Sequence, residues 1–180
     1  MQTETQRGFT LTELMVVITI VATLMAIGVP SYKYVTTANR VSAEVNAMLG
    51  DMQFARSEAI REGSPITVCA SADGATCVGG VNNTWQGGWI VFSDTNGNQA
   101  VDANEPVLRV KNAFASQDTF GSSVNAVTFN REGFGVNLPN AGVLVTLHDS
   151  TGNVAYTRCL SISLVGTVKT VTHQTLATCT

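Results

Sequence analysis

The stretch that decides the fold is Gly8-Phe9-Thr10-Leu11-Thr12-Glu13, followed directly by LMVVITIVATLMAIGVP over residues 14–30. Between Phe9 and Val29 the only ionisable side chain is that of Glu13. As a helix, this segment would span roughly 31 Å, about the thickness of the hydrocarbon core of a bilayer. The sequence therefore predicts an apolar helix over residues 9–30 that can cross a membrane, with a carboxylate near its start that needs a partner.

Two other interpretations of this segment remain open. It could be a cleaved secretory signal, since Ala26-Ile27-Gly28 supplies a small-x-small cleavage site, but an acidic residue early in the apolar region argues against this. It could also be a plain membrane anchor in which Glu13 is incidental.

The length and composition of the chain indicate one domain of ordinary size attached to this segment. The chain has 180 residues with 10 Lys and Arg against 13 Asp and Glu, a net charge of −3. Its mean hydropathy is +0.18 and its charged fraction 13%, about half the usual ~25% for soluble domains, which rules out disorder. A mildly acidic total also argues against a general polyanion binder, because affinity for phosphates grows with Lys and Arg contacts.

The N-terminal pattern resembles the class III leader of type IV pilins and type II secretion pseudopilins. The resemblance implies that a prepilin peptidase removes residues 1–8 by cutting after Gly8, and that the exposed Phe9 is N-methylated. It also implies that Glu13 of one subunit pairs with the Phe9 amine of its neighbour during filament assembly. Pro30 falls where helices of this family kink.

After Pro30 the pattern stays helical but becomes amphipathic over residues 31–62. Apolar residues spaced three and four apart draw one stripe along the helix: Ala38, Val41, Val45, Met48, Met52, Ala55 and Ala59. We expect the charged residues off this stripe to form a solvated face: Arg40, Glu44, Asp51, Arg56, Glu58, Arg61 and Glu62. Gly63 and Pro65 signal the helix end. The stripe is expected to pack on the chain's own sheet; a coiled coil is the alternative.

Residues 63–180 have the texture of a β-rich globular domain. Short runs rich in Val, Ile and Thr predict strands at 66–70, 89–93, 107–111, 127–130, 143–148, 154–163 and 167–172. Asn130–Gly133 and Asp149–Asn153 read as hairpin turns. The expected fold class is α+β, with the long N-terminal helix packed on an antiparallel sheet as in pilins.

Four cysteines fall as two pairs that are near in sequence, Cys69 with Cys77 and Cys159 with Cys179. A domain exported across an inner membrane can keep disulfides, and of the three pairings that four cysteines allow, the near one is favoured. Zinc is the rival interpretation, but neither pair has CxxC spacing and the two histidines are not clustered with them.

Three further runs resemble the GspH/FimT group of minor pilins and pseudopilins: residues 52–63, residues 66–69 and residues 87–94. The resemblance implies a non-catalytic minor subunit that helps prime a filament at or near its tip, in a type IV pilus or in a type II secretion system. Its partners would be other pilins or pseudopilins, prepilin peptidase and the inner membrane, which a single helix crosses with the domain in the periplasm.

Some FimT-like members bind DNA through a GRxR motif, so a DNA receptor in natural transformation is a further alternative. The counterpart here, Gly166-Thr167-Val168-Lys169, has one cation in place of two. Arg158, Lys169 and His173 could form a small positive spot, but three scattered cations on a β surface are more often solvated residues than a phosphate track, so the residues disfavour nucleic acid as a partner.

The segment Asp94–Glu105 has the spacing of a calcium loop. Oxygen side chains stand at loop positions 1, 3, 5, 9 and 12: Asp94, Asn96, Asn98, Asp102 and Glu105. Position 6, where such a loop needs Gly, is Gln99, and the preceding run reads as a strand rather than a helix. The competing interpretation is an ordinary Asn-, Asp- and Gly-rich β connection that needs no cofactor. No HExxH, GxSxG or nucleotide loop is present, so no enzyme is expected.

Overall fold

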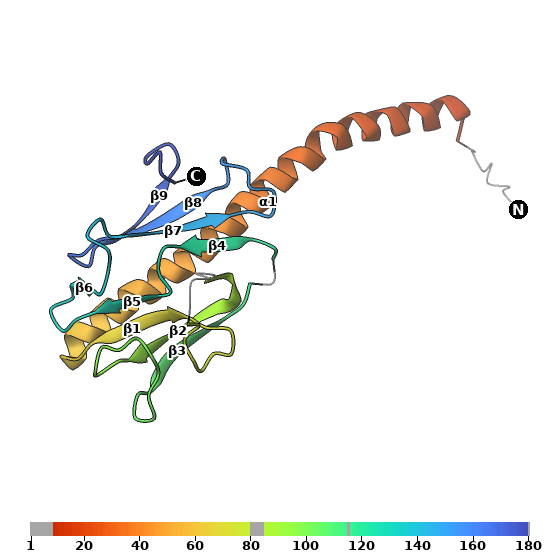
Figure 1. Ribbon diagram of the computed structural model, residues 1–180. Helices are drawn as coiled ribbons and strands as arrows, with labels where there is room; N and C mark the ends of the chain where they lie inside the picture. Colours follow the sequence, from red (N-terminus) through yellow and green to blue (C-terminus); the bar gives the residue numbers. More distant parts are fainter. Residues whose placement is uncertain (1–8, 80–84, 115, 180) are drawn as a thin grey trace, which may run out of the picture. The chain divides into compact units, whose positions relative to one another are not determined.

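The computed structural model describes residues 9–79, 85–114 and 116–179, coloured along the chain in Figure 1. The chain forms two compact units, residues 1–38 and residues 39–180. Helix α1, Leu11–Glu62, contributes its first part to one unit and its last part to the other. The helix ends as predicted, since Gly63 has a φ of 67° and its N–H donates to the carbonyl of Ala59.

The unit of residues 39–180 contains two antiparallel sheets. The first has the strand order β3-β2-β1-β5-β6. Its strands are β1 (Ile66–Ala70), β2 (Gly88–Ser93), β3 (Val107–Asn112), β5 (Ala126–Phe129) and β6 (Gly135–Val136), with the 3-10 turn η1 (Trp85–Gly87) before β2. The second has the order β4-β7-β8-β9, built from β4 (Thr119–Ser122), β7 (Val143–His148), β8 (Arg158–Ile162) and β9 (Val168–Thr172).

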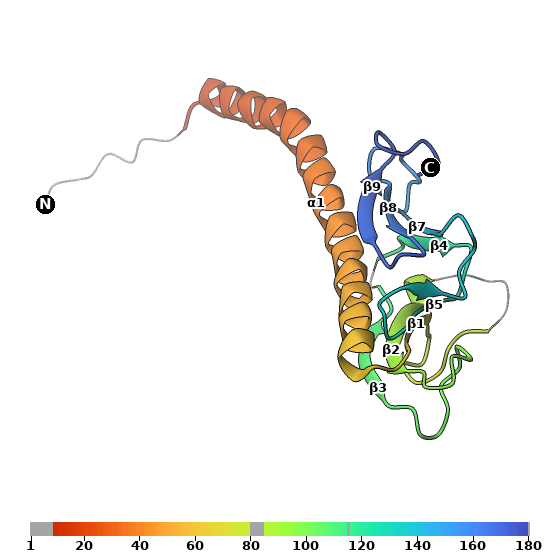
Figure 2. The same ribbon diagram turned by 90° about the vertical axis from the view of Figure 1, so that its left-hand side faces the viewer.

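This architecture confirms the α+β class: a long N-terminal helix packed on antiparallel sheets. In Figure 2 both sheets lie on the same side of the last part of α1, one further along the helix than the other. The buried side chains of the helix and of both sheets form one core, in which Val45, Val68 and Leu160 are examples from the three elements. Trp89 on β2 stacks on Phe120 on β4, with ring centroids 6.2 Å apart, so an aromatic pair joins the sheets.

The strands differ from the prediction in three places. β4 and β6 were not predicted. The last hairpin also begins later than expected: β8 starts at Arg158 rather than at Val154. The reason is a second set of turn bonds beyond the predicted turn: Asn153 accepts from the N–H of Ala155 at its side chain and from the N–H of Tyr156 at its carbonyl, and the carbonyl of Val154 accepts from the N–H of Thr157.

The apolar stripe of α1 is buried as predicted from Val41 to Ala59, and of the charged residues beside it Arg40, Arg61 and Glu62 are exposed as expected, whereas the other four are not. Several of these charged residues also bond to groups of the β-rich part of the chain. Arg40 makes two hydrogen bonds to the buried Asp118, at 2.7 and 2.8 Å. Asp51 accepts from Trp89 Nε1 at 2.8 Å and from Arg109 at 3.0 Å. A helix that carries two sheets is covered over a wider arc than one stripe, so its flanking polar residues are drawn into contacts.

The outer face of the first sheet carries a second, smaller core of Cys69, Ile90, Phe92 and Ala126. The structure contains two disulfides, Cys69–Cys77 and Cys159–Cys179, which is the near pairing. The first holds the loop after β1 against this outer face, and the second ties the C-terminal segment to β8. Residues of the segment 94–105 also pack there, through Val101.

Glu44 provides a test of this packing through pH. It is half-buried, and burial raises the pKa of its carboxyl, with the Asp118 carboxylate adding to the shift and Arg40 opposing it. The folded state therefore binds this proton more tightly than the unfolded state, and the charged carboxylate costs stability at pH values above its folded pKa. We expect Glu44→Gln to raise the melting temperature at pH 7 and to lose that gain by about pH 4, where the unfolded carboxyl is also protonated.

The control for this prediction is Glu132→Gln. Arg131 lowers the pKa of the exposed Glu132 carboxyl, so removing its charge should give no gain at pH 7. Thermal unfolding of both variants across this pH range checks the expectation. A melting-temperature difference for Glu44→Gln that is the same at pH 7 and pH 4 would contradict it.

Two glycines with similar backbones test the contact between the β5–β6 and β8–β9 turns. Gly166 has a φ of 75°, and a Cβ there would lie 1.9 Å from the carbonyl oxygen of Gly133, whereas Gly152, with a φ of 65°, has open space. Gly152→Ala should therefore lower the free energy of unfolding by about 1 kcal/mol, from the strained backbone alone. Gly166→Ala should cost roughly 1–3 kcal/mol more, because the turns must separate. Intrinsic tryptophan fluorescence during thermal unfolding measures the difference, and equal losses would refute the contact.

Candidate functional site

The start of α1 brings together the residues that the leader pattern singled out. Gly8 lies outside the described residues, as does the rest of the segment 1–8. Phe9 is 86% exposed and stands just before the helix. Glu13 lies in the first turn of α1.

Glu13 and Thr10 form a capping box. Oε2 of Glu13 accepts from the backbone N–H of Thr10 and from its hydroxyl, both at 3.0 Å. In return the N–H of Glu13 donates to the hydroxyl oxygen of Thr10 at 3.2 Å. This reciprocal pair satisfies two backbone donors at the start of the helix. The sequence analysis missed it, although the signal, Thr10-x-x-Glu13, was there to read.

The geometry of this box matters because both bonds end on the same oxygen. Within the residues described, Oε1 of Glu13 makes no hydrogen bond. The carboxylate is thus held in place at the helix start and still has one oxygen for a further donor. The positive end of the helix dipole also favours an anion at this position.

The helix surface that follows is apolar and uncovered. Large side chains including Leu14, Val17 and Leu24 are more than half exposed. A stretch of 18 residues within α1 has a mean hydropathy of 2.3, and none of that stretch is buried. By length and composition this helix can therefore cross a membrane. In water, an isolated chain with such a surface would tend to aggregate.

The polar atoms of this segment are satisfied within the helix itself. The hydroxyl of Thr23 donates to the carbonyl of Ile20 at 2.8 Å, and the hydroxyl of Thr19 donates to the carbonyl of Met15. Back-bonding of this kind lets threonine sit in an apolar environment without an unpaired donor. Pro30 lies inside α1, and the kink expected there stays a prediction.

The acidic loop keeps its carboxylates occupied with its own backbone. Asp94 is fully buried and accepts from the hydroxyl of Thr67 at 2.6 Å and from the N–H groups of Asn98 and Gln99 at 3.0 Å. Gln99 takes the left-handed conformation, φ 61°, that a Gly was expected to provide. The loop therefore reaches its shape through Asx-type turns.

The other acidic positions of this loop are bonded too. Glu105 accepts from the N–H of Thr95 at 2.8 Å and from that of Asp102 at 3.1 Å. Asp102 in turn accepts from the amides of Asn96 and Asn98. In the described part of the chain, His, Cys, Asp and Glu side chains do not gather in a group of three suited to a metal ion. Calcium binding itself stays untested.

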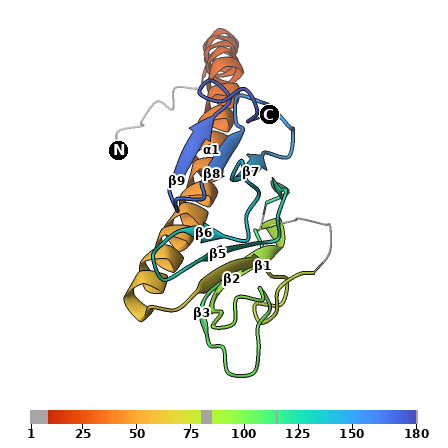
Figure 3. The ribbon, with the colours of Figure 1, turned by 60° about the vertical axis from the view of Figure 1, so that its left-hand side comes forward.

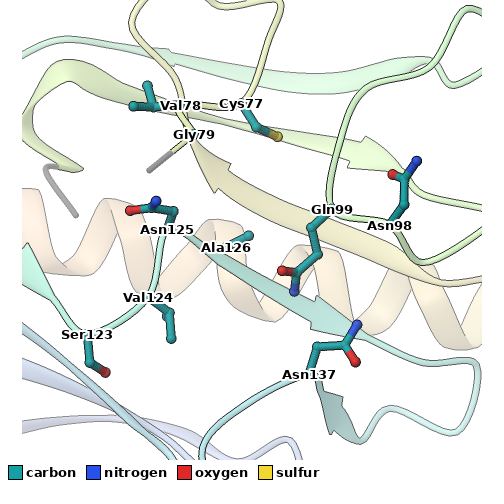
Figure 4. A pocket seen from close by; sticks show the side chains of 10 residues that line it. All are labelled: Cys77, Val78, Gly79, Asn98, Gln99, Ser123, Val124, Asn125, Ala126 and Asn137. Atoms are coloured by element: carbon teal, nitrogen blue, oxygen red, sulfur yellow. The ribbon is translucent and has the colours of Figure 1, made fainter. Parts of the chain in front are cut away.

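A cavity of about 490 Å³ lies beside β5 and is lined by uncharged groups, as Figure 4 shows. Gln99 and Asn137, the two described residues other than glycine with positive φ, both line it. Its sulfur, from Cys77, is held in a disulfide, and the lining offers no general acid or base that could activate the hydroxyl of Ser123. The cavity gives no support to a catalytic role.

The three candidate cations, Arg158, Lys169 and His173, lie on or directly after β8 and β9. Lys169 lies on β9 opposite Ser161, and Arg158 donates to the carbonyls of Ala155 and Thr157 next to it. Gly166 packs closely against the carbonyl of Gly133. DNA binding by these residues stays untested.

Comparisons with known proteins agree with this arrangement. The family model of the type II transport protein GspH matches residues 44–166, and that of the prokaryotic N-terminal methylation motif matches residues 5–29. The type IV minor pilin FimU of Pseudomonas aeruginosa is similar in one crystal form at 24% identity, TM-score 0.57, over 79% of this chain and 94% of FimU. In a second form the values are 25%, 0.55, 76% and 94%.

The minor pseudopilin EpsH from the type 2 secretion system of Vibrio cholerae shares the fold. It is 7% identical with a TM-score of 0.50, over 73% of this chain and 96% of EpsH. The GspH match covers more than half of the chain and includes the end of α1 and every strand except β9. The chain therefore belongs to the GspH family of pilin-type structural subunits, which are not enzymes.

Proposed function

We propose that this protein is a minor pilin of a type IV pilus that helps to prime assembly at or near the filament tip. The observation that carries the proposal is the uncovered apolar surface of α1 that begins at Phe9 and Glu13. Such a surface needs a bilayer before assembly and the helices of other subunits afterwards. The family shares this design, in which membrane-anchored subunits assemble through their N-terminal helices.

The greater likeness to FimU supports a pilus rather than a secretion system. FimU reaches 25% identity over nearly its whole length, whereas EpsH shares 7%. In this proposal the chain sits in the bacterial inner membrane with residues 39–180 in the periplasm, which also suits its two disulfides.

The proposed route to assembly begins with cleavage after Gly8. The freed Phe9 amine becomes N-methylated and keeps its positive charge. The free Oε1 of Glu13 then accepts from the Phe9 amine of a neighbouring subunit, while Oε2 stays bonded to Thr10. A carboxylate that is costly in an apolar environment gains a cation there, so subunits whose registers align are favoured.

Substitution at the cleavage site tests the first step. Gly8→Ala should leave the leader attached, since the peptidase of this family cuts after the glycine. Immunoblots of membranes should then show only the longer precursor and no chain in sheared filaments. Normal processing of Gly8→Ala would contradict the assigned site.

Glu13 can be tested so that its two roles separate. Glu13→Gln retains a side chain that can complete the capping box but lacks the charge, whereas Glu13→Ala loses both. If ion pairing drives assembly, both variants should be processed normally and both should be depleted from filaments by about tenfold or more. Thr12→Ala, on the same turn, is the matched control. Normal incorporation of Glu13→Gln would show that capping alone explains the residue.

We also infer that the 94–105 loop is held by hydrogen bonds and needs no calcium. Its three carboxylates already accept from backbone N–H groups or amides within the loop. The melting temperature of the chain in detergent should be the same in millimolar calcium and in EDTA. A rise of several degrees with calcium would reverse this inference.

A further inference from the structure

Four large apolar side chains gather on the surface of the unit formed by residues 39–180. They are Ile60 on α1, Phe134 in the β5–β6 turn, and Leu164 and Val165 in the β8–β9 turn, here called the Ile60 patch. Their exposures are 52, 47, 38 and 58%. Figure 3 shows the β5–β6 turn and the start of β9 beside the last part of α1.

Close backbone contacts bring these three segments together. A Cβ added to Gly133 would lie 2.8 Å from Cδ1 of Ile60. A Cβ added to Gly166 would lie 1.9 Å from the carbonyl oxygen of Gly133. The N–H of Gly135 donates to the carbonyl of Leu164 at 2.9 Å. The fold thus fixes the spacing of the patch through two glycines, and the patch does not depend on flexible loops.

The patch has a hollow beside it. A groove of about 420 Å³ lies on the same part of α1 and is lined by Gln53, Arg56, Ser57 and Ile60. Single exposed apolar residues are ordinary, but a cluster next to a hollow is typical of a protein interface.

The charges around the patch indicate the chemistry of the surface that would cover it. Arg56 donates from Nε to the carbonyl of Gly133 at 2.9 Å, and among the described residues no carboxylate lies within ion-pair distance of it. The nearby Glu58 and Glu132 are already paired with Arg61 and Arg131. A partner that covers the patch must therefore supply a carboxylate of its own, because burying an unpaired guanidinium is costly.

We propose that the Ile60 patch is an assembly surface that receives an apolar, carboxylate-bearing surface of a different pilin-type subunit in the same filament. This rests on the proposed filament role. A two-fold pairing of two copies through the patch is disfavoured, since it would bring two Arg56 side chains together without an acid between them. A contact between unlike surfaces is also the kind that continues into a filament instead of closing a dimer.

Charged substitutions in the patch test this with the full chain in its native membrane. Ile60→Asp and Val165→Asp should each be processed and inserted normally but fall about tenfold or more in sheared filaments, as expected for a central interface residue. Val154→Asp is the matched control, because Val154 is similarly exposed at 43% but lies away from the patch, before β8. Melting temperatures within about 2 °C of the parent chain establish that the variants fold.

A photo-crosslinking amino acid, p-benzoylphenylalanine, at position 165 gives a second readout that does not depend on the charged variants folding. A cross-link identified by mass spectrometry as a different pilin-type subunit supports the proposal. A cross-link to a second copy of this chain, or none to any filament subunit, overturns it.

The outcomes also separate this inference from the proposed function. If the patch variants enter filaments normally while Glu13→Gln does not, the patch is not an assembly surface and the filament role stands. If Glu13→Gln and the patch variants all enter filaments normally, the ion pair and the patch are both ruled out and the filament role stands; absence of the parent chain from sheared filaments would overturn the proposed function itself.

Discussion

The constraint on which this protein depends is the apolar surface of the first part of α1, which has an ionisable residue, Glu13, at its start. An apolar helix surface with exposed Leu14, Val17 and Leu24 must lie against lipid or against other helices. Glu13 sharpens that requirement, since a carboxylate at the start of such a helix needs donors. The capping box with Thr10 supplies two of them on one oxygen and leaves the other oxygen unbonded among the described residues. In the proposed function, membrane insertion and assembly thus both use this segment.

In the unit of residues 39–180, one helix packs against two sheets. The last part of α1 buries Val41, Met48 and Met52 against strands from both sheets. The polar residues flanking this stripe then become anchors, as the bond of Arg40 to Asp118 and that of Asp51 to Trp89 show. The two disulfides secure segments at the edges of this core, which lets loops such as 94–105 be shaped by hydrogen bonds of their own.

Much of the fold could be predicted because its signals are local. The helix stripe and its end at Gly63 follow from spacing and from glycine's freedom at positive φ. The strands that read clearly are runs of β-branched residues. β4 and β6 escaped because Thr119–Ser122 contains Gly121 and Gly135–Val136 is only two residues long, so their pairing depends on distant partners. Val154 was misassigned because the turns in which Asn153 and Val154 accept hydrogen bonds outweigh the strand propensity of the following residues.

The site shows the same division. Phe9 and Glu13 could be singled out from order along the chain, and the capping box was readable from Thr10-x-x-Glu13. The roles of Arg40, Arg56 and Asp51 could not, because each is decided by a residue far away in the sequence. The Ile60 patch likewise exists only where three separate segments meet.

The most direct measurement of the central claim is the intact mass and N-terminal sequence of the chain recovered from native membranes. The account predicts a single species that begins at Phe9 and carries one added methyl group. A chain that still begins at Met1, or one that begins just after Gly28 as a cleaved secretory signal would leave it, contradicts the account.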